Sequence, residues 1–148
     1  MDKLNIKLHG AFTMILEKAN GEVETLHKDN LIVDTGFDLI ADAVFKSASR
    51  PAVGDYIAIG TGAVAAAAGD VALGVEVVRA QAAYAHTAGT KVLTVSHTFA
   101  PGVGTGALTE AGIFNAASSG TMFDRVVFPV VNKGASDTLT TTFTLTMS

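Results

Sequence analysis

The chain of 148 residues has the length of one domain, and the absence of cysteine excludes disulfides, thiolate zinc sites and cysteine nucleophiles. Only 16% of the residues are charged, well below the roughly 25% of an average domain, so we expect part of the surface to contact a partner. The net charge is −4 with Lys and Arg scattered along the chain, which argues against nucleic-acid binding because clustered cations are needed to neutralise phosphates.

The N-terminal third begins with a predicted β-hairpin. Apolar and polar residues alternate from Leu4 to Leu16, and Asn20-Gly21 is typical of a hairpin turn. We expect this hairpin, residues 1–33, to contact a partner, because added strands supply backbone hydrogen bonds. The start of the chain lacks the continuous apolar core of a signal peptide, and no stretch approaches about 18 apolar residues in a row. We therefore expect synthesis in the cytoplasm and no membrane span.

A helix is predicted at about residues 35–48, where apolar residues change to helical spacing. We expect it to pack across one edge or end of a sheet. Asp34, Asp38 and Asp42 recur every four positions along it. Three carboxylates in a row could bind a hard cation, but a solvated polar face explains them better, and we expect no metal site.

The rest of the chain reads as strands separated by turn signals about every dozen residues. Together with the hairpin they make about eight strands, which is typical of an antiparallel β-sandwich of the jelly-roll type. We therefore expect a mainly β, single β-sandwich domain over residues 1–148. The further strands are expected at residues 55–62, 76–86, 91–101, 107–116, 121–131 and 137–148.

Motifs that carry catalytic chemistry are weak in this sequence. The four histidines do not have the spacing of metal ligands, and no GxSxG elbow is present. The glycine-rich segment at residues 102–106 precedes a predicted strand and not a helix, so a phosphate site is disfavoured. We expect no enzyme and no cofactor.

The segment from Met122 to Val131 is apolar on both faces of its predicted strand. Pro129 lacks an amide hydrogen, which places the strand at an edge or a bulge, and an apolar edge would aggregate unless covered. Two covers are open: another subunit, or the helix of the same chain. On the first, the assembly interface would contain Phe123, Arg125, Val127, Phe128 and Pro129, with His97 on a neighbouring apolar strand face. For His97 a place in the core is the alternative.

Several short motifs occur in a fixed order and resemble a group of small structural proteins of tailed bacteriophages. The resemblance covers about residues 20–147. The motifs are the segment Asn30 to Gly36, then "YIAIGTG" (56–62), "ALGVEVVRA" (72–80), "TEAGIFNA" (109–116), "MFDRVVFP" (122–129) and "DTLTTTFTLTM" (137–147).

The resemblance implies a non-enzymatic virion component that is made in the host cytoplasm. A capsid decoration (cement) protein is expected first, as a homo-oligomer, a trimer in particular, bound to the major capsid protein or other virion proteins. A tail, baseplate or fibre module is the alternative. A carbohydrate-binding β-sandwich is disfavoured, because the chain has no Trp and only two tyrosines to offer as sugar platforms.

Overall fold

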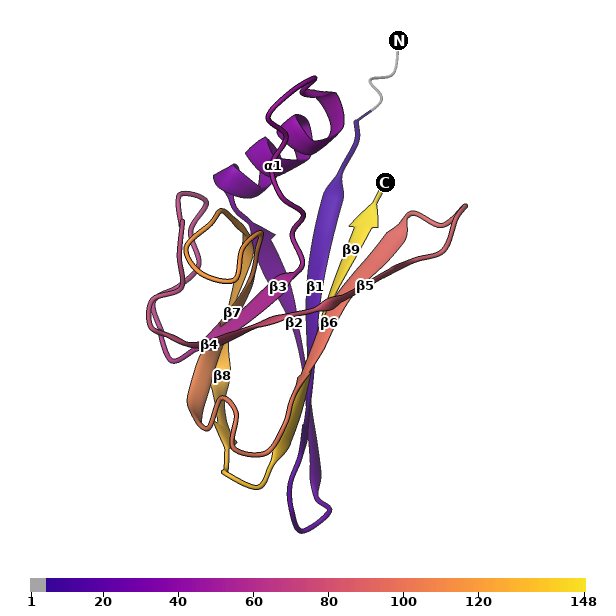
Figure 1. Ribbon diagram of the computed structural model, residues 1–148. Helices are drawn as coiled ribbons and strands as arrows, with labels where there is room; N and C mark the ends of the chain where they lie inside the picture. Colours follow the sequence, from indigo (N-terminus) through magenta and orange to yellow (C-terminus); the bar gives the residue numbers. More distant parts are fainter. Residues whose placement is uncertain (1–4) are drawn as a thin grey trace.

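The computed structural model describes residues 5–148, which form a mainly β structure with one helix (Figure 1). Nine antiparallel strands make one nearly closed sheet, a β barrel or sandwich. The elements are β1 (Leu8–Glu17), β2 (Val23–Ile32), α1 (Asp34–Phe45), β3 (Tyr56–Gly60), β4 (Glu76–Gln81), β5 (Ala83–His86), β6 (Val92–Phe99), β7 (Gly106–Phe114), β8 (Met122–Lys133) and β9 (Thr138–Met147).

The strands follow one another in the sheet in the order β4-β3-β7-β8-β2-β1-β9-β6-β5. The predicted N-terminal hairpin is confirmed as β1 and β2, which pair from Gly10–Asn30 to Glu17–Val23. Residues 1–4, where the hairpin was predicted to begin, lie outside the described residues. The long strands of the hairpin, β9 and β6 form one half of the sheet, and β8, β7, β3 and β4 form the other (Figure 1).

The sheet has nine strands and not about eight because the strand predicted at residues 76–86 is two strands. β4 and β5 lie at opposite ends of the strand order, so the chain crosses from one half to the other at Ala82. The Ala82 N–H leaves the ladder there and donates to the Asp55 carbonyl at 2.7 Å. The covalent chain thereby closes the sheet on this side.

On the opposite side the closure depends on a short junction between β2 and β8. Leu31 pairs with Arg125 and Ile32 pairs with Asp124. The earlier residues of β2 pair only with β1, and the later residues of β8 pair only with β7. The two halves of the sheet therefore separate beyond this junction, toward the start of β2 and the end of β8.

The core lies between the two halves and follows from the alternation of apolar residues. Phe12 of β1 stacks on Phe128 of β8 with ring centroids 5.4 Å apart, and it contacts Phe143 of β9 at 4.8 Å. On β9 the residues at odd positions from 139 to 145 are buried, while the threonines at even positions are partly exposed. Burial of one strand face in each half therefore supplies most of the apolar stabilisation.

Helix α1 begins at Asp34, directly after β2, and packs at one end of the sheet (Figure 1). It spans residues 34–45, against 35–48 predicted. Its close contact is with β8, where Gly36 lies against the carbonyl oxygen of Phe123. The N–H of Val33, just before the helix, donates to the same oxygen at 3.2 Å. The absence of a side chain at Gly36 therefore lets the helix approach the strand.

Replacing Gly36 by Ala tests this approach. The added Cβ would overlap the Phe123 carbonyl oxygen, which belongs to backbone and cannot turn aside. We expect Gly36→Ala to lower the unfolding free energy by roughly 1–3 kcal/mol, the usual cost of overpacking, as measured by urea denaturation. Gly69→Ala is the control, because a Cβ at Gly69 meets no atom within 4 Å. Equal stability of the two variants would contradict the prediction.

Candidate functional site

The six residues predicted to form an assembly interface do not lie together on the surface. Phe123 and Phe128 belong to the core, and Arg125 is 3% exposed. Val127 is half-buried and Pro129 is exposed. The sixth, His97, is half-buried on β6 in the other half of the sheet, where its ring lies edge-on to Phe99 with centroids 4.6 Å apart. Pro129 is therefore the predicted residue that offers the most surface.

The second apolar face of the first part of β8 is covered by the same chain. Met122 packs in a small cluster with Phe114, Ala58, Val33 and Leu73. Leu73 comes from the long loop at residues 61–75 that connects β3 to β4, and Val33 immediately precedes α1. The loop and the start of the helix therefore cover the face for which another subunit was expected.

The carboxylate of Glu110 fastens this loop to the outside of the sheet. It is fully buried and accepts three backbone hydrogen bonds, from Gly62 at 2.8 Å, Gly74 at 2.8 Å and Val75 at 2.7 Å. Its Oε2 also accepts from Nε and Nη2 of Arg125 at 3.1 and 3.0 Å. Burial by itself would raise the pKa of Glu110, but these donors outweigh it and lower the pKa.

Arg125 extends the same network to the far side of the loop. Its Nη1 donates to Asp70 at 2.8 Å, and its Nη2 donates to the Val64 carbonyl at 2.9 Å. Burial opposes the charge of Asp70, yet the hydrogen bonds from the Ala67 N–H and from Arg125 lower its pKa overall. Neither Glu110 nor Asp70 is among the candidate residues predicted from the sequence. The one sequence signal for Glu110 is an acidic residue inside the apolar "TEAGIF" strand.

A second buried carboxyl group, Asp124, lies at the junction of β2 and β8. Its Oδ1 accepts the N–H of Ile113 at 2.9 Å, and its Oδ2 contacts Nδ2 of Asn30. Complete burial raises the pKa of Asp124 to about 8 despite these two donors, so the group is largely protonated at neutral pH. Among residues 5–148, Oδ1 of Asn30 has no hydrogen-bond partner. Rotation of the Asn30 side-chain amide by about 180° would exchange Nδ2 and Oδ1, and Oδ1 would then accept a hydrogen bond from protonated Asp124.

An exposed apolar surface lies at the end of the sheet that carries α1; we call it the apolar end. Phe37, Val44 and Phe45 of the helix are 51%, 63% and 83% exposed. Between the helix and the strand ends is a hollow of about 780 Å³, lined mostly by apolar side chains that include Phe37, Leu93 and Leu145. The helix packs at one end of the sheet, as expected, and Leu39 lies against the core, but Phe37, Val44 and Phe45 remain exposed.

The apolar end is suited to docking a large apolar surface. Exposed apolar patches of this kind mark sites of interaction.

Two further features of the described part of the chain bear on metal binding and on crossing a membrane. Within residues 5–148 no three His, Asp or Glu side chains lie together as a metal site would require. No helix in the same residues has the length and hydrophobicity to cross a bilayer.

Removing the Arg125 side chain tests the buried network. Arg125→Ala leaves the Glu110 carboxylate buried with only its backbone donors, and breaking a buried pair costs about 3–5 kcal/mol. We expect a loss of this size in urea denaturation, with early proteolysis in the 61–75 loop. Lys46→Ala is the control, because it removes an exposed pair with Asp42 and should cost less than about 1 kcal/mol. Similar losses in the two variants would contradict a structural role for Arg125.

The raised pKa of Asp124 predicts a stability that falls as the pH rises. The folded protein holds this proton up to about pH 8, while the unfolded chain releases it near the ordinary aspartate pKa of 3.8. Between these values folding takes up a proton, so a rise in pH opposes folding. Asn resembles the protonated form, so Asp124→Asn should flatten the decline in unfolding free energy between pH 5 and 8. Asp38→Asn, at an exposed helix position, should leave the slope unchanged. A wild-type slope in Asp124→Asn would show that Asp124 is ionised.

Comparison of the chain with models of protein families, with curated proteins and with solved structures finds no match. The function is therefore inferred from the geometry and from the resemblance in the sequence.

Proposed function

We propose that the chain is a non-enzymatic structural protein of a tailed-bacteriophage virion, a capsid decoration (cement) protein that stabilises the head shell. The observation that carries the proposal is the apolar end. Phe37, Val44 and Phe45 are at least half exposed on one short helix, beside an apolar hollow of about 780 Å³. Covering such a surface is favourable by about 25 cal/mol per Å² of apolar area.

The buried network makes the rest of the molecule suitable as a rigid binding module. Glu110 and Arg125 fasten the 61–75 loop to the sheet, so the chain can dock without reorganising this part. Docking of preformed surfaces avoids much of the ordering cost of association. The partner in this proposal is the major capsid protein or another virion protein, and the chain acts as a homo-oligomer. The finer description of the fold as a jelly-roll-like sandwich belongs to the same proposal.

The copy number in the virion tests the proposal. Quantitative mass spectrometry of purified virions from the phage that encodes the chain should find hundreds of copies, as coverage of a shell requires. A dozen or fewer copies, in multiples of three or six, would replace the decoration role by a tail, baseplate or fibre role. Absence from the virion would overturn both.

Substitutions at the apolar end test the docking surface itself. Val44→Ser with Phe45→Ser removes apolar area that docking would bury. A loss of about 1.4 kcal/mol of binding free energy weakens binding tenfold, so the number of copies per virion should fall at least about tenfold. Both side chains are exposed, so the fold should persist, as checked by circular dichroism. Val64→Ser with Val71→Ser is the matched control, since these exposed valines lie in the 61–75 loop. Unchanged copy numbers for the helix variant would move the contact elsewhere.

A further inference from the structure

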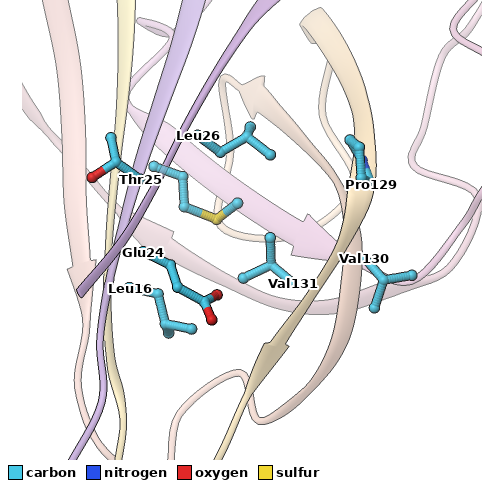
Figure 2. A pocket seen from close by; sticks show the side chains of 8 residues that line it. Leu16, Glu24, Thr25, Leu26, Pro129, Val130 and Val131 are labelled. Carbon is cyan, nitrogen blue, oxygen red and sulfur yellow. The ribbon is translucent and has the colours of Figure 1, made fainter. Parts of the chain in front are cut away.

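The free edge of β2 forms one wall of a groove on the open side of the sheet. Before Leu31, β2 pairs only with β1 among residues 5–148, so in this part of the chain the backbone groups on its other side lack a strand partner. Figure 2 shows the groove between β2 and β8, with Leu16, Leu26 and Val131 inside it. The groove has a volume of about 180 Å³. An unpaired strand edge beside apolar side chains is a template for pairing with another strand.

Two charged side chains of β2, Glu24 and Lys28, lie on the face of the sheet that points toward the core. Glu24 is opposite Leu16, Leu26 is opposite Met14 and Lys28 is opposite Phe12 on β1, whose side chains are all buried. Glu24 and Lys28 are nevertheless exposed, because β8 has separated from β2 at this level. One inward-pointing charge on an edge strand ordinarily prevents pairing, but here two charges of opposite sign flank a leucine symmetrically.

We propose that a second copy of the chain pairs its β2 antiparallel to this β2, with a two-fold axis at Leu26. In this register each Leu26 faces the other, and Glu24 of each copy lies opposite Lys28 of the other. Opposite charges directly across an antiparallel pair stabilise it. Lys28 thereby gains an opposite charge, Glu24 gains a second one besides Lys18 of its own chain, and the two leucines cover the apolar groove.

The charge pattern selects this register over its neighbours. A shift by one residue would turn each side chain to the wrong face. A shift by two residues places Glu24 opposite Leu26 or opposite Asn30 of the other copy, so the Glu24–Lys28 pairs and the central Leu26 pair are lost. In the first of these registers Lys28 lies opposite Glu22, which precedes β2. On the other wall of the groove, Pro129 of β8 has no N–H to donate. The incoming strand therefore pairs with β2 and not with β8.

The contact is two-fold and does not depend on the proposed virion role. A ring of three copies, which the resemblance implies, needs a contact between two different surfaces. The self-pairing of β2 predicts a dimer in solution. Sedimentation equilibrium of the isolated protein therefore tests this inference separately from copy numbers in virions.

Charge reversal with rescue tests the contact. Glu24→Lys and Lys28→Glu each place like charges opposite one another twice in the dimer, so each should raise the dimer Kd at least about tenfold. The double variant restores the pairs and should return the Kd to within about threefold of wild type. Oε1 of Glu24 also lies 3.0 Å from Nζ of Lys18 in its own chain. The double variant does not restore that pair, so rescue reports on the contact between copies alone.

Glu22→Lys is the matched control, because it makes the same charge change beside Lys18 but lies outside the central pairs. It should leave the Kd within about threefold of wild type. Circular dichroism confirms that each variant is folded. A wild-type monomer or trimer, a dimer unaffected by the single reversals, or a double variant that fails to recover would each overturn the proposal.

Discussion

Two successive residues of β8, Asp124 and Arg125, hold the structure together at the short junction where β8 pairs with β2. They pair with the end of β2, and within the described residues 5–148 this is the one place where β8 pairs with the other half of the sheet. Asp124 also joins β7 through the Ile113 N–H, and Arg125 binds Glu110 and the loop at residues 61–75. Since a buried charge without partners costs several kcal/mol, these contacts select one arrangement of strands and loop.

The junction also explains why the molecule has two incomplete surfaces. On one side of it, α1 follows β2 directly and is tied to β8 at Gly36. Leu39 packs against the core, whereas Phe37, Val44 and Phe45 remain exposed. On the other side of it, β2 and β8 diverge, which leaves an edge of β2 without a strand partner among residues 5–148. Part of the small complement of charged residues is used inside, at Glu110, Asp124 and Arg125. The surface that remains is correspondingly apolar, and this favours a protein that works in an assembly.

Features set by neighbouring residues were predictable. The alternation around Phe12 and Phe143 predicted β1 and β9, because side chains of a strand point to opposite faces in turn. The turn at Asn20-Gly21 and the change of period near residue 37 predicted the hairpin and the helix. The network of Glu110 with Gly62 and Arg125 was not predictable, because its members are separated by 48 and 15 residues. No local pattern reports such a contact.

By itself the sequence determined that the chain is β-rich, that one helix follows the hairpin, and that the strand at residues 122–131 is apolar on both faces. The tertiary structure alone decided what covers those faces: the 61–75 loop and the start of α1 on one side, the core on the other. It also turned Arg125 from a candidate for an interface into an internal anchor. The physical reason is that periodicity records which face is apolar, whereas its cover depends on residues distant in the chain.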